Sequence, residues 1–195
     1  MDCEMHITVK EGEIDQFTEH CKFLGIKPIL IQTERDDNFG EQLMTSSKCE
    51  RNDYLTQFFD IYEYFIKKRY EVIRLKVEKF PEETKDNDFI YYESHLRLKL
   101  EKNFNRSTLI ELCKNNNFHL SKNLFKRDEN YDYQMITYRD YEIDLTSFKE
   151  KINHMVKLLD EKNINHDKIE IEECIYDSNV LVDYDWLKLY EHSPH

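Results

Sequence analysis

Apolar and polar residues alternate along residues 3–10, and this pattern predicts a β-strand with one apolar and one polar face. The apolar positions are Met5, Ile7 and Val9, and the polar positions are Glu4, His6, Thr8 and Lys10. A second segment of the same character follows at residues 89–100. There, Glu93, His95 and Lys99 stand 89 positions after Glu4, His6 and Lys10, with Arg97 in place of Thr8. The chain therefore contains two related strands, each with a glutamate and a histidine on its polar face.

The apolar spacing predicts two helices and three further strands in each half of the chain. Apolar residues three or four positions apart indicate helices at residues 14–24, 53–68 and 107–117, and a fourth that begins after Asp144. Gly25 suits the C-terminal cap of the first helix, and Asp53 and Asp144 suit N-terminal caps. Strands are also predicted at residues 27–32, 42–46, 70–79, 119–126, 134–137 and 168–175, with a loop at residues 33–40.

Short matching blocks occur in the same order in both halves. Blocks 21–22 (Cys-Lys) and 42–45 (Gln-Leu-Met-Thr) return 92 positions later as Cys113-Lys114 and Gln134-Met135-Ile136-Thr137. We infer a tandem duplication of a ferredoxin-like unit of order βαββαβ. The predicted fold is α+β, with antiparallel sheets and two helices per unit on one sheet face. The predicted domains are 1–80 and 89–177, joined by a linker at 81–88 and followed by a tail, 178–195, that packs on the body.

Composition and charge argue against a disordered, nucleic-acid-binding, membrane-spanning or secreted protein. The chain has 195 residues, of which 39% are apolar, and only 3 Gly and 3 Pro, which favours a packed core over disorder. The net charge of −12 makes nucleic acid an improbable partner. No apolar run reaches the ~18 residues of a membrane helix, and the N-terminus lacks the pattern of a signal peptide. The 5 cysteines contain no CxxC pair, so we predict a soluble, cytoplasmic protein with reduced thiols.

The polar strand faces are the best candidates for a site, because the helices of each unit cover the apolar face. We expect the first and fourth strands of each unit to be central and adjacent, so that their polar residues converge. Sheets placed face to face or edge to edge would then enclose a polar cleft. We predict that it binds a small anionic or phosphorylated ligand, which lysine and arginine would neutralise. The predicted ligand-binding residues are Glu4, His6, Thr8, Lys10, Arg74, Lys76, Glu93, His95, Arg97 and Lys99. Glu78, Lys168, Glu170 and Glu172 are predicted to share these faces.

Other interpretations of the same residues stay open. The charges could form cross-strand pairs without a ligand, which would make the protein a non-enzymatic interaction module. A metal could be held by His6 or His95 with Glu4 or Glu93, but the neighbouring lysines oppose a cation, and no metal is predicted. The candidate catalytic residues are His6 and His95. No Gly-rich phosphate loop, Gly-x-Ser-x-Gly or His-Glu-x-x-His pattern occurs, so the sequence indicates no particular cofactor.

Two resemblances to known families follow from these motifs. The segment His6-Ile7-Thr8-Val9 resembles the His-x-Thr-apolar motif of the 2H phosphoesterases, which carry two such motifs on pseudo-symmetric lobes. That resemblance implies a hydrolase in which one histidine acts as base and the other as acid, while hydroxyl groups hold the phosphate. The second half departs from the motif, with Arg97 in place of Ser or Thr.

The second resemblance is to an uncharacterised family of tandem-repeat ferredoxin-like proteins. It is carried by the twin Glu-x-His strands, the Gln-x-x-Thr strand, and the tail Asp177-Ser178-Asn179 with Asp183 and Trp186. It implies the duplicated fold and no particular activity.

Overall fold

The structure is a computed structural model that describes residues 2–35, 38–50, 52–81, 89–126, 128–183 and 187. The predicted linker at 81–88 lies outside the described residues except for Pro81. Most of the predicted tail, including Trp186, also lies outside them.

Each half of the chain has the order β-α-β-β-α-β, which confirms the order predicted from the hydrophobic pattern. The first half contains β1 (Asp2–Val9), α1 (Ile14–Leu24), β2 (Lys27–Arg35), β3 (Asn38–Glu50), α2 (Tyr54–Lys67) and β4 (Val72–Lys79). The second half contains β5 (Tyr91–Glu101), α3 (Ser107–Asn116), β6 (His119–Asn123), β7 (Tyr131–Asp140), α4 (Leu145–Glu161) and β8 (His166–Asp177). A single 3-10 turn, η1 (Val180–Asp183), follows β8.

The eight strands form one closed antiparallel barrel in the order β1-β3-β2-β6-β7-β5-β8-β4. The two halves contribute the equivalent runs β4-β1-β3-β2 and β8-β5-β7-β6, and they join at the seams β2–β6 and β4–β8. The sheets of the two units therefore meet edge to edge at both seams, which is one of the two predicted arrangements. Closure pairs the edge strands, whose N–H and C=O groups would otherwise lack partners, and it turns the polar faces inward. The predicted adjacency of the first and fourth strands is found in both halves.

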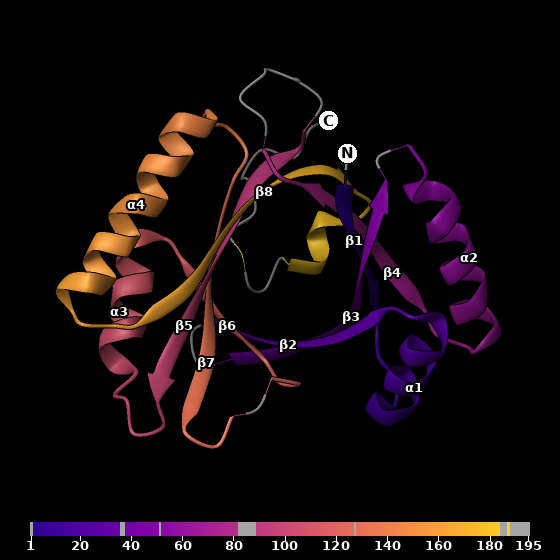
Figure 1. Ribbon diagram of the computed structural model, residues 1–195, viewed down its shortest axis with the longest axis horizontal. Coiled ribbons are helices and arrows are strands. Elements are labelled where there is room, and N and C mark those ends of the chain that lie inside the picture. Colours follow the sequence, from indigo (N-terminus) through magenta and orange to yellow (C-terminus); the bar gives the residue numbers. More distant parts are fainter. Residues whose placement is uncertain are drawn as a thin grey trace.

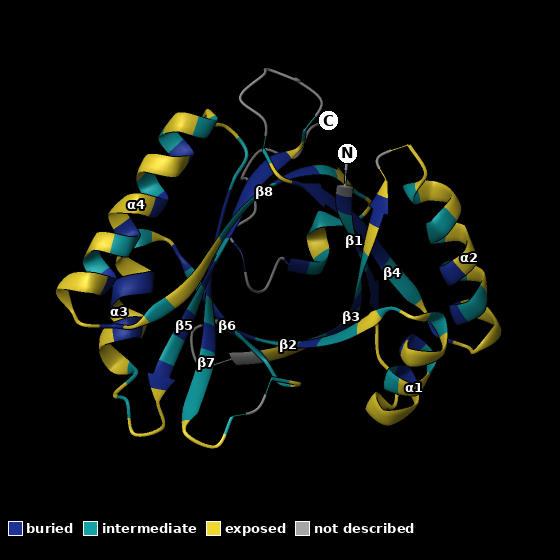
Figure 2. Ribbon diagram, viewed as in Figure 1, coloured by how far each residue is buried: buried dark blue, intermediate teal, exposed yellow. Residues whose placement is uncertain are grey.

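The apolar strand faces point outward and are covered by the helices. In Figure 1, α1 and α2 lie on one side of the barrel, and α3 and α4 lie on the opposite side. One apolar core contains Met5, Ile7 and Phe17, each 0% exposed, and the other contains Leu96 and Phe148, also 0% exposed. Strand β4 is buried from Arg74 to Lys79, so its inward residues Lys76 and Glu78 are buried as well as the outward ones. Figure 2 shows buried, intermediate and exposed residues along the barrel and the helices.

Local structure departs from the predictions in three places. Residues 33–40 are not a simple loop, because β2 and β3 extend into a long hairpin in which Thr33 pairs with Gly40. Asp144 caps α4 by accepting hydrogen bonds from two backbone N–H groups, whereas Asp53 makes no side-chain cap at α2.

The third departure concerns the repeat of Gln42 and Gln134. Gln42 faces the barrel interior, but Gln134 faces outward. Because a shift of one residue moves every side chain of a strand to the other face, the offset of 92 is one residue out of register. Within the described residues, no helix is long and apolar enough to cross a membrane.

A candidate ligand-binding cavity inside the barrel

A cavity of about 770 Å³ lies inside the barrel and is lined by inward residues of all eight strands together with Asp183. Eight of the ten predicted ligand-binding residues line it: Glu4, His6, Thr8, Arg74, Lys76, Glu93, His95 and Arg97. The polar strand faces of the two units therefore converge on one cavity, and both histidines line it.

Lys10 and Lys99 do not line the cavity, contrary to the predicted convergence. The Lys10 ammonium is exposed and lies 3.2 Å from the Glu71 carboxylate, and that of Lys99 lies 3.9 Å from the centre of the Tyr131 ring. The strand pairing shifts register after Thr8 in β1 and at the equivalent point, after Arg97, in β5. Leu98 and Leu100 stay in the apolar core, so Lys99 keeps the polar face of β5 but lies beyond the cavity, toward the strand end, and Lys10 follows the last residue of β1.

His6 forms the first of two equivalent centres in the cavity. Its Nδ1 lies 3.1 Å from the Thr45 carbonyl oxygen, to which it donates. Its Nε2 faces two carboxylates, Glu78 at 3.3 Å and Glu4 at 3.8 Å. Glu4 also accepts a 2.5 Å hydrogen bond from the Ser46 hydroxyl, so its carboxylate is held in place from the neighbouring strand.

His95 forms the second centre. Its Nδ1 lies 3.0 Å from the Thr137 hydroxyl oxygen, and its Nε2 lies 3.1 Å from Glu93 and 3.7 Å from Glu172. Burial acts to lower the pKa of His95, but the hydrogen bond and charge of Glu93 outweigh it and raise that pKa. Strand pairing makes the two centres equivalent, because Glu4 pairs with Glu78 as Glu93 pairs with Glu172.

Lys76 connects the two centres. Its buried ammonium lies 2.8 Å from Glu78 and 3.2 Å from Glu93. Burial disfavours the charge on Lys76, but these carboxylates reverse the effect and raise its pKa. A continuous series of contacts therefore runs from His6 through Glu78, Lys76 and Glu93 to His95.

The carboxyl groups of Glu78 and Glu172 have very different proton affinities. Burial acts to raise the pKa of Glu78, but Lys76 and the hydrogen bond from His6 lower it to about 2. For Glu172, burial and the charge of Glu78 act together and raise the pKa to about 7. The centre of the cavity thus holds one carboxylate that stays ionised and one group that exchanges a proton near neutral pH.

One end of the cavity is closed by buried ion pairs. Arg139 lies 2.5 Å from Glu93 and 2.7 Å from Asp183, and Arg74 lies 2.9 Å from Asp183 and 2.5 Å from Asp177. All five side chains are at most 3% exposed. This end of the cavity is therefore filled by two arginines and three carboxylates of the protein itself.

The other end of the cavity carries a basic rim, formed by Lys27, Arg97, Lys126 and Lys168. Arg97 pairs with Asp167 at 2.6 Å, and Lys168 pairs with Glu170 at 2.5 Å. Lys27 and Lys126 form no ion pair with any described residue. Burial lowers the pKa of Lys126, and the charges of Arg97, Lys168 and Lys27 act in the same direction against the charge of Asp167, which raises it.

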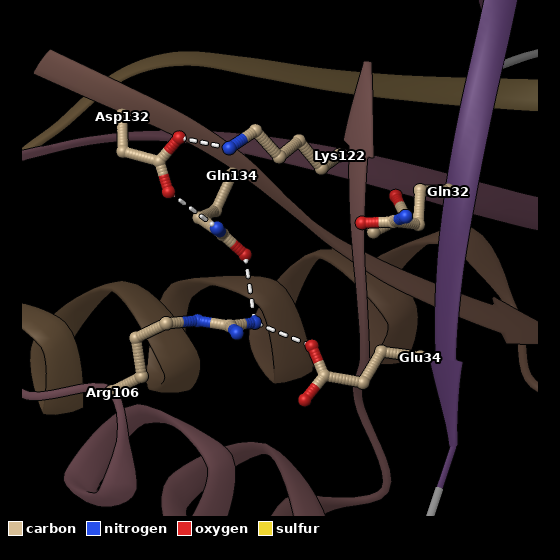
Figure 3. Close-up of a pocket in the computed structure, with 7 residues that line it drawn as sticks. Gln32, Glu34, Arg106, Lys122, Asp132 and Gln134 are labelled. Carbon is tan, nitrogen blue, oxygen red and sulfur yellow. Dashed lines mark hydrogen bonds and ion pairs between the residues drawn. The ribbon is translucent and has the colours of Figure 1, made fainter. Parts of the chain in front are cut away.

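A second, smaller cavity of about 100 Å³ lies outside the barrel at the β2–β6 seam (Figure 3). Arg106 donates to Glu34 and, at 3.1 Å, to Gln134, while Lys122 pairs with Asp132. Its two cations and two carboxylates are matched, so this cavity is part of the contact between the halves.

Within the described residues, no group of three His, Cys, Asp or Glu side chains is arranged to hold a metal ion.

Sequence reasoning missed two residues that hold the closed end together, Arg139 and Asp183. The predicted strand ended at Thr137, although continued alternation through Met135 and Thr137 would have placed Arg139 on the same inward face. Asp183 follows the last strand; it was named only in the tail of the second resemblance, and nothing there linked it to the site. Glu78 and Glu172 were placed on the correct faces, but their contact with the two histidines depends on strand pairing.

The fold and the cavity define an α+β protein in which a duplicated βαββαβ unit closes into one barrel with a polar interior. No family model matches the sequence, and no curated protein matches it either. Among solved structures, the small subunit of acetolactate synthase from Thermotoga maritima is 10% identical, with a TM-score of 0.34 over 91% of this chain and 96% of that one. A proposed monooxygenase from Fusobacterium nucleatum subsp. nucleatum is 12% identical, with a TM-score of 0.36 over 96% and 97%. A proposed chlorite dismutase is 9% identical, with a TM-score of 0.31 over 90% and 96%. Likeness at this level carries no argument about function.

Proposed function

We propose that the barrel cavity binds a small organic anion, phosphorylated or carboxylated, whose charged group docks at the basic rim. The observation that carries the proposal is the pair of lysines without carboxylate partners, Lys27 and Lys126, beside Arg97 and Lys168 at one end of a large cavity. An anion placed there would supply the missing countercharge. The chain as a whole carries a net charge of −12, so this local excess of positive charge is opposite in sign to the overall charge.

The dimensions and lining of the cavity suit a small metabolite. Cavities of about 300–1,000 Å³ are typical of small-molecule sites, and this one measures about 770 Å³. Apolar side chains share the wall with the charged ones: Ile29, Ile31, Met44, Phe125 and Met135. The ligand would therefore combine an anionic group with a less polar body that reaches toward the two histidine–glutamate centres.

The alternative functions are less well supported by the same geometry. A purely structural role for the strand charges does not require a cavity of this size or cations without partners. Hydrolysis by a histidine pair would need a reactive nitrogen free to meet the substrate, but Nε2 of both His6 and His95 already faces carboxylates. Arg97 is also paired with Asp167.

The test is binding to a panel of nucleotides, sugar phosphates and small carboxylates, screened by thermal shift and measured by calorimetry. The double variant K27Q/K126Q is expected to bind the best ligand at least about tenfold more weakly, which corresponds to about 1.4 kcal/mol. The control, K149Q/K157Q, removes the same charge from exposed positions on α4 and should bind normally. Equal weakening by both double variants would refute a rim site, as would the absence of any ligand in the panel.

The two histidines provide a second test of the same proposal. The variant H6A/H95A should lose ligand binding while keeping most of its stability. If this variant binds the ligand as well as the wild type, the ligand does not reach the centre of the cavity, and that part of the proposal fails.

A further inference from the structure

The segment after β8 folds across the closed end of the barrel. Ser178 and Asn179 bind the backbone of β4, through Ser178 N to the Leu75 carbonyl at 2.9 Å and Asn179 Nδ2 to the Ile73 carbonyl at 3.1 Å. Beyond them, the turn η1 meets the barrel through Gln42, which donates to the Val182 carbonyl at 3.3 Å, and through the Asp183 carboxylate, while Leu181 is 66% exposed. Figure 1 shows this turn between the two halves of the barrel.

Asp183, at the end of η1, is the residue that this segment inserts into the barrel. Its carboxylate receives Arg74 Nη1 at 2.9 Å, Arg139 Nη2 at 2.7 Å and Gln42 Nε2 at 3.0 Å. Burial acts to raise the pKa of Asp183, but the two arginines outweigh it and lower that pKa. Three donors from β3, β4 and β7 therefore converge on one oxyanion, and two of them are guanidinium groups, which match carboxylate and phosphate geometry.

The charge of Asp183 is not required to neutralise the closed end. Arg74, Lys76 and Arg139 already face three other carboxylates, those of Asp177, Glu78 and Glu93. Removing the Asp183 carboxylate would leave three cations and three anions there, but it would leave the converging donors without an acceptor. What the site requires is an oxyanion to accept these hydrogen bonds, and any oxyanion of suitable size meets that need.

We propose that Arg74, Arg139 and Gln42 form a second oxyanion site, which the chain fills with its own Asp183 and which an external carboxylate or phosphate group can occupy in its place. This site is distinct from the basic rim. On β3, Gln42 of the oxyanion site lies four residues from Ser46, which pairs with Lys27 of the rim. On β5, Glu93 at the closed end lies four residues from Arg97 of the rim. At about 3.3 Å per residue, each interval spans about 13 Å. The two sites therefore lie at opposite ends of the cavity.

The variant D183A tests the proposal, with acetate and inorganic phosphate as probes and chloride at equal ionic strength as the reference. A tethered group competes at an effective concentration on the order of millimolar or more, so its removal should tighten oxyanion binding at least tenfold. D53A is the matched control, because it removes one carboxylate that makes no side-chain cap at α2. It should bind both anions as weakly as the wild type.

Hydrogen exchange in the wild type provides an independent measurement. The amides of Val182 and Leu187 are bonded to Asn179 O and Asp183 O within this segment, and phosphate should speed their exchange while strand amides stay protected. If D183A does not fold, L187A serves instead, since it removes a buried apolar contact of the segment and leaves Asp183 in place. It should also bind oxyanions more tightly than the wild type.

The proposal fails if neither variant binds acetate or phosphate more tightly than the wild type. It also fails if phosphate slows exchange at Val182 and Leu187, because the anion would then stabilise the seated segment. Repeating D183A in the K27Q/K126Q background separates this site from the rim. The tightening should persist there, whether or not the rim binds a ligand.

Discussion

Replacing Glu172 with glutamine should stabilise the protein above neutral pH. Glu172 is buried inside the barrel, and burial together with the charge of Glu78 raises its pKa from an ordinary value of 4.5 to about 7. The charged and titratable groups that act on it come from four other strands: His6 on β1, Lys48 on β3, Lys76 and Glu78 on β4, and His95 on β5. Glutamine keeps the size of the side chain and removes the charge.

The sign and size of the effect follow from proton linkage. Because the folded pKa is the higher one, the native state binds more protons than the unfolded state between pH 4.5 and 7, so stability falls as pH rises through that window. The whole penalty is present above pH 7. A shift of about 2.5 pKa units at 1.36 kcal/mol each amounts to about 3 kcal/mol. E172Q should therefore be more stable than the wild type by up to about 3 kcal/mol at pH 8, and nearly equal to it at pH 4.5.

The assay is urea unfolding followed by far-ultraviolet circular dichroism at pH 4.5 and pH 8 and at constant ionic strength. The matched control is E170Q, two residues along the same face of β8, where the carboxylate pairs with Lys168 near the rim. That change should alter the free energy of unfolding by only about 0.5 kcal/mol at either pH, as is usual for partly exposed pairs. A loss of stability in E172Q at pH 8, or a gain of equal size at both pH values, would refute the reasoning.

Two further predictions concern stability. The variant K76M removes the cation between Glu78 and Glu93 and should cost about 3–5 kcal/mol at pH 8, because it leaves buried carboxylates without their partner. The loss should be smaller at pH 5, where a carboxyl freed from Lys76 can take up a proton, and an equal loss at both pH values in urea unfolding would contradict this. The second prediction compares two helix starts. D144A should cost about 1 kcal/mol because Asp144 caps two backbone N–H groups, whereas D53A should cost much less, and equal losses would show that the observed cap does not contribute.

The order of the helices and strands could be predicted from the sequence because each of them has a regular spacing of apolar residues within its own segment. Alternation along β1 and β5 placed His6 and His95 on polar faces, and the three- or four-residue spacing located all four helices. The barrel could not be predicted in the same way. Its closure depends on the seams β2–β6 and β4–β8, which join residues about 90 or more positions apart. A polar strand face that meets solvent and one that lines an enclosed cavity have the same alternation.

The candidate site shows the same division between local and non-local information. Eight predicted residues converge because strand pairing preserves the face of each side chain, whereas Lys10 and Lys99 lie toward the strand ends, beyond the cavity. Arg139 and Asp183 could not be linked to the site from sequence, since their contact joins β7 to the segment after β8.

The βαββαβ pattern occurs twice, but the cavity between the two repeats is not symmetric. The two halves provide equivalent histidine–glutamate centres, but the residue paired with His6 is Lys76, while the residue paired with His95 is Glu170. Lys76 lies between the two centres and contacts a carboxylate of each, whereas Glu170 forms an ion pair with Lys168 at the rim. A cavity with identical halves would present a ligand with two equal orientations. Here, Asp183 occupies the arginines of the closed end, while Lys27 and Lys126 at the other end form no ion pair with any described residue, so an elongated anion would have one favourable direction as long as Asp183 stays in place.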